Sequence, residues 1–150
     1  MKKILVAISF FLINFLQANN NAIDLFKLYK ELHSNPELSY QELETSKRLA
    51  FILEDLGYEV TKNVGGNGVV ALLRNGKGKT VMFRADMDGL PVKERTGASY
   101  ASKKKVINLE GEEVSTMHAC GHDVHMTVLI GVAEYLYKNQ SSWQGNLLLV

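Results

Sequence analysis

The segment MHACGHDVHM, residues 117–126, contains three of the four histidines of the chain and its only cysteine. Cys120 and His122 are separated by Gly121, which permits a tight backbone path, so that a loop can bring both side chains to one ion. Thiolate and imidazole together suit zinc and other borderline divalent ions. The sequence therefore predicts a metal site with Cys120 and His122 as ligands.

Three further side chains of this segment are candidates for additional ligands, for partners of the ligands or for substrate contacts: His118, Asp123 and His125. A helix that begins near Gly121 would place its positive end here, which favours the thiolate form of Cys120 but opposes a bare cation. Anionic groups are therefore needed if an ion is to be held at this position.

A second segment with chemical potential is RADMDGLP, residues 84–91, which follows an apolar stretch. In α/β sheets, ligands gather beyond the carboxyl ends of strands. Asp86 and Asp88 are two residues apart, so in an extended segment both carboxylates would point to one side and could face one site. The alternative is that this Asp-x-Asp only shapes a turn.

Other cysteine and histidine chemistries fit the sequence less well. Deaminases of the His-x-Glu and Pro-Cys-x-x-Cys type need further cysteines, as do covalent haem attachment and most structural zinc knuckles. A single cysteine also excludes an internal disulfide. A nucleophilic Cys120 paired with His122 stays possible, although nothing local supplies an oxyanion hole.

The N-terminus has the layout of a secretory signal. Lys2 and Lys3 precede a short apolar core, and a small residue, Ala18, follows at a cleavage position. The core is shorter than the roughly 20 apolar residues of a membrane-spanning helix. We therefore predict a signal peptide at residues 1–18 and export to the periplasm or the medium without a stable membrane anchor; an uncleaved anchor is the alternative. The net charge of +1 gives no electrostatic case for nucleic acid.

Apolar periodicity predicts two helices in the first third of the chain that follows. We expect the first to be capped by Asn21 and to end before Pro36. The second opens on a capping box, in which Ser39 is the N-cap residue and Glu42 reaches back to it. Gly57 occupies the position of a left-handed C-terminal cap.

Three strands are expected next: residues 58–64, residues 69–73 and residues 79–85. The continuous apolar run of residues 69–73 fits a strand buried on both faces. The turn sequence NGKG separates it from residues 79–85, so the second of these strands is predicted to run antiparallel to the first.

The second half of the chain predicts a small hairpin at 106–114, a helix at 121–139 and a buried strand at 146–150. Helices that alternate with apolar strands indicate an α/β layered fold. Residues 19–150 are predicted to be the N-terminal part of a longer protein, with a domain that is incomplete at its C-terminus, because an apolar strand at the chain end lacks partners.

Three segments resemble the metal-dependent amidohydrolase and carboxypeptidase family that includes hippurate hydrolases, N-acyl-amino-acid amidohydrolases, aminoacylases and auxin-conjugate hydrolases. They are LHSNPELSYQE (32–42), FRADMDGLPVKE (83–94) and MHACGHDVHMTVLIGVAEYL (117–136), in this order. The resemblance implies that residues 19–150 are the N-terminal part of a dinuclear metallopeptidase-like catalytic metallohydrolase domain, an α/β fold with a mixed sheet flanked by helices.

The resemblance also implies roles for individual residues. Cys120 and His122 would bind the metal pair, and Asp88 would be the catalytic-site aspartate that orients a metal ligand. Asp86 stands where related peptidases carry a metal-binding histidine, and its contact with metal is left open. The general-base glutamate of the family belongs to a Glu-Glu pair that would follow residue 150.

The function implied is hydrolysis of the amide bond of N-acyl amino acids or short peptides, with two divalent ions per complete site, zinc or manganese, with cobalt or nickel also compatible. A homodimer is expected for the full-length protein, and the 150-residue chain is expected to be inactive alone. The alternative from another class is a non-catalytic metal-binding or interaction protein derived from the same family.

Overall fold

The computed structural model describes residues 22–150 of the protein, so the predicted signal peptide at residues 1–18 lies outside the described residues. The described elements, in chain order, are α2 (Leu25–Ser34), α3 (Leu43–Asp55), β1 (Glu59–Val64), β2 (Gly68–Asn75), β3 (Thr80–Phe83), β4 (Lys105–Ile107), β5 (Glu113–Ser115), α4 (His122–Lys138), a 3-10 turn (Gln140–Ser142) and β6 (Gly145–Leu149).

Four of the strands form a mixed sheet in the order β1-β2-β6-β3. β2 pairs antiparallel with β1 and β6, whereas β3 pairs parallel with β6. The prediction that β2 and β3 run antiparallel is therefore confirmed, although the two strands are not neighbours, because the last strand of the chain inserts between them. The turn at residues 76–79 reverses the direction of the chain, and it leaves room for β6 between β2 and β3.

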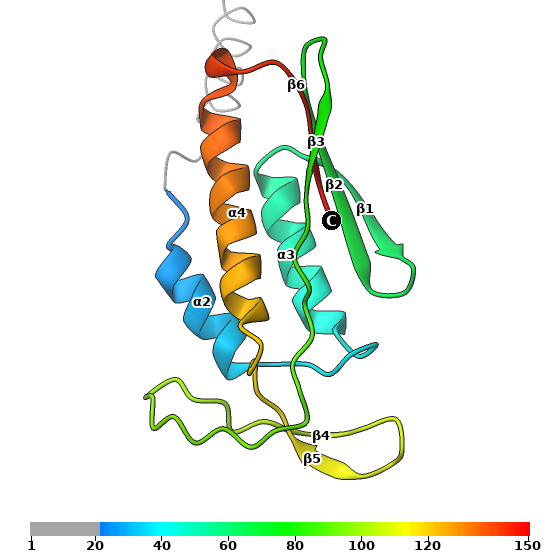
Figure 1. Ribbon diagram of the computed structural model, residues 1–150, viewed down its shortest axis with the longest axis vertical. Coiled ribbons are helices and arrows are strands. Elements are labelled where there is room, and N and C mark those ends of the chain that lie inside the picture. The colour runs from blue at the N-terminus through cyan, green and yellow to red at the C-terminus, as the bar shows by residue number, and fades with distance from the viewer. Residues whose placement is uncertain (1–21) are drawn as a thin grey trace, which may run out of the picture.

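The helices described within residues 22–150 lie on one side of this sheet, where α3 packs against β1 and β2, and α2 packs against α4 (Figure 1). Alternate side chains of β2 point into the core and the others are partly exposed, so this strand is not buried on both faces as its apolar run predicted. The core lies between helices and sheet, and its most buried side chains include Ala50, Ala71, Met126, Ile130 and Leu149. No helix within residues 22–150 has the length and apolarity to span a membrane.

The N-terminal caps of α2 and α3 differ from the sequence prediction. The carboxylate of Asp24 accepts the backbone N–H of Lys27 at 2.9 Å and so caps α2, while Asn21 lies outside the described residues. The predicted capping box is absent from α3, which begins at Leu43 without a cap bond from the side chain of its N-cap residue, Glu42. Another carboxylate, that of Glu37, fills this place.

The C-terminal cap of α3 is as predicted, since Gly57 has the left-handed φ of 89°. The hairpin prediction is also confirmed by β4 and β5, which pair antiparallel. The long segment after β3 descends towards the start of α4 and the hairpin (Figure 1). It is held there by paired hydrogen bonds between the backbones of Leu90 and Met117, at 2.8 and 3.0 Å.

Candidate metal centre

The two segments with predicted site residues, 84–91 and 117–126, are in contact through Asp88 and His122. Nδ1 of His122 lies 2.9 Å from the backbone carbonyl oxygen of Asp88 and 2.9 Å from its carboxylate oxygen Oδ1. Because a carbonyl oxygen can only accept, Nδ1 carries a proton and donates it. In the neutral ring, Nε2 then keeps the lone pair that a metal ion would take.

The backbone around Cys120 turns sharply into α4. Gly121 is the N-cap residue of this helix and has a left-handed φ of 75°, which explains a glycine between the two candidate ligands. Cys120 is exposed and is a free thiol. Cys120 is therefore not part of the core, and its sulfur atom is accessible to an ion from the solvent side.

Asp86 and Asp88 do not share a target. Both carboxylate oxygens of Asp86 bind the guanidinium of Arg84, on the exposed side of the segment. The two carboxylates therefore have different ion-pair partners, although both residues line the same cavity, described below. Asp88 alone contacts a candidate ligand.

The other two histidines of the segment lie in different environments. His125 is exposed, and its ring centroid is 5.8 Å from that of His122. His118 is buried, and neither of its ring nitrogens has a hydrogen-bond partner among residues 22–150. Burial lowers the pKa of His118 below its usual 6.5, although the nearby carboxylate of Asp123 opposes this effect.

The donor chemistry at the start of α4 fits a metal ion in part. The exposed thiol of Cys120 and the nitrogen Nε2 of His122 are ligand types that zinc accepts. The carboxylate of Asp88, which contacts Nδ1 of His122, is a usual partner of a metal-binding imidazole. Within residues 22–150, however, there is no group of three or more His, Cys, Asp or Glu side chains that could hold a metal ion. These residues supply part of a coordination sphere.

A cavity of about 260 Å³ lies beside this segment. Its floor is apolar and includes Leu49, Met126 and Leu149, and its rim carries the charged side chains of Arg84 and Asp86. Asp88 also lines the cavity, so the cavity adjoins the residue that contacts Nδ1 of His122. An apolar chamber with a few charged groups at one end is the usual form of a small-molecule site.

A buried cluster of charged side chains, with no role predicted from the sequence, lies next to the first turn of α4. His33, in the last turn of α2, lies between the carboxylates of Asp123 and Glu94, at 2.7 and 3.0 Å. The only signal in the sequence was that His33 is the remaining histidine and lies in one of the three family-like segments. Nothing in its spacing indicated two acidic partners 61 and 90 residues away.

The mixed α/β layer, with candidate metal ligands at the helix that follows its loops, defines the class of dinuclear metallopeptidase domains. A solved structure of a dinuclear metal-binding peptidase of family M20 from Bacillus subtilis superposes on 83% of this chain and 33% of its own, with a TM-score of 0.72 and 35% identity. This likeness establishes that the chain has the mixed α/β fold of the matched part of that dinuclear metal-binding peptidase.

The sequence comparisons agree with this class. Residues 82–150 match Peptidase family M20/M25/M40. Hippurate hydrolase of Campylobacter jejuni is 44% identical over 122 residues, which cover 81% of this chain and 30% of that protein. Thermostable carboxypeptidase 2 of Saccharolobus solfataricus is 43% identical over 128 residues, which cover 84% of this chain and 30% of that protein.

Residues 82–150 of the chain are similar to Peptidase family M20/M25/M40, and the relatives named above are 43% and 44% identical to it over part of their length. The chain spans about 30% of the length of these curated relatives. The resemblance inferred from the three sequence segments is therefore confirmed at the level of the family.

Proposed function

We propose that the full-length protein is a metal-dependent amidohydrolase that cleaves the amide bond of N-acyl amino acids. The observation that carries this proposal is the pair formed by Asp88 and His122, which leaves Nε2 of His122 available beside the exposed Cys120. A carboxylate that orients a histidine through its other nitrogen is the usual second partner of a metal-binding imidazole.

The substrate class is supported by the named relatives. A hippurate hydrolase acts on an N-acylated amino acid, and a carboxypeptidase acts on the C-terminal residue of a peptide. Both reactions break an amide bond next to a free carboxylate. An N-acyl amino acid or a short peptide fits this shared chemistry, with Arg84 at the rim of the neighbouring cavity as a charge of the right sign for a carboxylate.

We propose two divalent ions per complete site, with zinc or manganese as the first metals to test. Cys120 and His122 would hold them from this part of the chain, and Asp88 would fix the ring of His122. Divalent metal ions supply polarisation of an amide carbonyl and a water of lowered pKa. The remaining ligands and the general-base glutamate are proposed to come from outside residues 22–150.

We also propose that the protein is exported after removal of residues 1–18 and that it acts as a homodimer. Two experiments address these points. The N-terminal sequence of the secreted or periplasmic protein would identify the cleavage site, and analytical ultracentrifugation would give the mass of the assembly. Retention in the membrane fraction would contradict the export proposal.

The function is tested by an assay of the full-length protein with hippurate, with N-acetyl amino acids and with a dipeptide, in zinc and in manganese. We expect turnover of at least one N-acylated amino acid, its loss with a chelator, and its loss in Cys120→Ala and His122→Ala. Bound metal without turnover would favour the non-catalytic alternative. The 150-residue chain is expected to show no turnover, and robust hydrolysis by this chain alone would contradict our placement of the general base.

A further inference from the structure

A buried charge cluster joins the three segments that carry the family resemblance. His33 comes from the first segment, Glu94 from the second and Asp123 from the third. Nδ1 of His33 lies 2.7 Å from Oδ2 of Asp123, and Nε2 lies 3.0 Å from Oε1 of Glu94. The three side chains are nearly closed to solvent, with exposed fractions of 9% for His33, 2% for Asp123 and 0% for Glu94.

The hydrogen bonds at this cluster require a charged imidazole if both carboxylates are ionised. A neutral imidazole donates from one nitrogen only, whereas an imidazolium donates from both. Ionised carboxylates only accept, so two of them on opposite sides of one ring are both satisfied by an imidazolium. The cluster then carries one positive and two negative charges, and its remaining acceptor capacity has to be met elsewhere.

Further donors meet that requirement. Glu94 also accepts from the hydroxyl of Thr96 and from the backbone N–H of Ser102, and Asp123 accepts from the backbone N–H of Val124 at 2.9 Å. Burial acts to lower the pKa of His33, but its bonds to Glu94 and Asp123 outweigh this effect and raise it above 6.5. The pKa of Glu94 is lowered, because these hydrogen bonds outweigh the opposing effect of its burial.

Two helix ends favour the same charges. His33 lies in the last turn of α2, where the negative end of the helix dipole stabilises a cation. Asp123 lies in the first turn of α4, where the positive end stabilises an anion. The ion pair therefore joins the end of one helix to the beginning of the other with both dipoles in the favourable sense.

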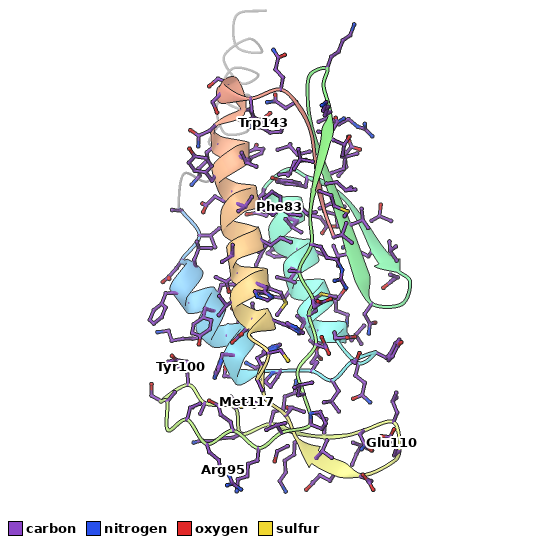
Figure 2. The ribbon with its side chains drawn as sticks, in the orientation of Figure 1. Phe83, Arg95, Tyr100, Glu110, Met117 and Trp143 are labelled. Carbon is purple, nitrogen blue, oxygen red and sulfur yellow. The ribbon has the colours of Figure 1, made fainter. Side chains whose placement is uncertain are left out.

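The groups around the imidazole close it off from water. Tyr29 of α2 and Tyr100 of the loop lie with their ring centroids 5.5 and 5.3 Å from that of His33. Figure 2 shows Tyr100 beside the end of α2, and Met117 near the start of α4. The other titratable group near the ring is the buried His118, whose charge would repel that of His33.

The first turn of α4 is thus held from two sides by consecutive residues. Asp123 is bound to His33 on the helix side, and His122 is bound to Asp88 on the strand side. We propose that His33 is a positioning residue for the metal site: bridging Glu94 and Asp123 as an imidazolium, it fixes the first turn of α4 and so the direction of the free nitrogen of His122. This inference rests on the proposed metal site.

The test is cobalt(II) binding to the full-length protein, followed by calorimetry and by visible absorption of the cobalt–thiolate chromophore. His33→Gln keeps a polar side chain but cannot donate to both carboxylates. We expect its affinity for cobalt to fall by roughly 10- to 100-fold, as for other residues that orient ligands. Glu31→Gln, on the surface of the same helix where Glu31 pairs with Arg48, is the matched control and is expected to bind cobalt as the unaltered protein does.

Rescue separates positioning from a general loss of structure. In His33→Gln two buried carboxylates face each other without a cation, so removal of one charge in His33→Gln/Glu94→Gln is expected to restore part of the cobalt affinity. If His33→Gln does not fold, Glu94→Gln alone serves as the test, with weaker cobalt binding and a lower pKa of His33 expected. Unchanged cobalt affinity and absorption in a folded His33→Gln or Glu94→Gln would overturn the proposal.

Nitrogen-15 NMR of the imidazole provides a readout that does not depend on metal. Both nitrogens of His33 are expected to be protonated at pH 7, and a single protonated nitrogen would overturn the proposal. Cys120→Ala and His122→Ala test the metal site itself. If they bind cobalt normally, the proposed metal site is wrong, whereas weak binding in these variants and normal binding in His33→Gln would refute only the role of His33.

Discussion

Nδ1 of His122 lies 2.9 Å from the backbone carbonyl oxygen and 2.9 Å from the carboxylate oxygen Oδ1 of Asp88. The ring is therefore held by one acceptor that a substitution can remove and one that it cannot. This division makes the contribution of the carboxylate measurable, because the backbone carbonyl still specifies which nitrogen is protonated when the side chain changes.

Asp88→Asn is expected to lower the metal affinity of the full-length protein by roughly 10- to 100-fold without abolishing binding. The negative charge of the carboxylate makes Nε2 of His122 a better ligand. The amide keeps the size of the carboxyl group but lacks this charge. Isothermal titration with zinc measures the effect. Asp86→Asn is the matched control, since Asp86 pairs with Arg84, and it is expected to change zinc affinity little. Equal losses in both variants would contradict the assignment.

Cys120 is expected to react with iodoacetamide in the metal-free protein and to be protected in proportion to bound metal. The thiol is free and exposed, so the reagent can reach it in the absence of metal. Mass spectrometry after timed labelling measures the modified fraction with and without zinc. Because this is the only cysteine of the chain, the label on these residues reports one site. Labelling that zinc does not slow would contradict a role for Cys120 as a ligand.

The helices and strands themselves were predicted from the sequence more accurately than the pairing of the strands in the sheet. Apolar periodicity indicated α4 and β6, and glycine chemistry indicated the cap at Gly57, because these signals are local. The position of β6 between β2 and β3 depends on contacts between segments about 70 residues apart, such as Leu73 with Leu147, which no local pattern records. The parallel pairing of β3 was missed for the same reason.

The candidate site was predictable to a similar extent. Cys120 and His122 were found because their types and spacing are unusual, and Asp88 was found through the family resemblance. The partners of His33 were not, since a histidine between two carboxylates is produced by the crossing of three segments. The pairing of Asp86 with Arg84, two residues away, was not predicted, because the spacing of the two aspartates does not show which cation each one binds.

Two of the three ionisable groups of the buried cluster, His33 and Glu94, predict opposite limbs of a pH–stability profile. The pKa of His33 is raised above 6.5, so its stabilising effect is complete below pH 6.5 and is lost as the pH rises through its value in the folded protein. The pKa of Glu94 is lowered below 4.5, so its effect is complete above pH 4.5 and is lost as the pH falls through its folded value.

Urea unfolding of the full-length protein at pH 5.5 and at pH 8.5 therefore checks the basic limb. The free energy of unfolding is expected to be lower at pH 8.5, and the difference is expected to shrink in His33→Gln, which has no imidazole to titrate. An undiminished difference in this variant would assign the pH dependence to other groups. Glu31→Gln should keep the difference of the unaltered protein.

The exposed strand β3 predicts self-association of the 150-residue chain. Val81, Met82 and Phe83 are 54%, 60% and 44% exposed, and β3 is an edge strand with unpaired backbone groups on one side. A charge on such an edge opposes pairing between copies. Met82→Lys is expected to reduce association in sedimentation experiments. Thr61→Lys on β1, the opposite edge, is the control, and an equal effect there would point to net charge in place of the apolar edge.

The carboxylate of Glu37 caps the start of α3 in place of the predicted capping box, so its removal is expected to lower stability. This buried carboxylate accepts the backbone N–H of Thr45 at 2.8 Å and that of Glu44 at 3.3 Å, so it satisfies donors at the start of α3 that have no partner within the helix. Glu37→Ala is expected to lower the free energy of unfolding by about 1–2 kcal/mol, as for the loss of an N-cap. Urea unfolding measures this change.

Ser39→Ala is the matched variant, since Ser39 was the expected N-cap residue and is exposed in the structure. It is expected to change the free energy of unfolding by less than about 0.5 kcal/mol, as for surface positions. The same comparison decides between the two capping schemes, because a capping box would make Ser39→Ala the more damaging change and leave Glu37→Ala nearly neutral. A larger loss for Ser39→Ala would therefore show that α3 begins earlier in solution, at the boundary that the sequence pattern predicted.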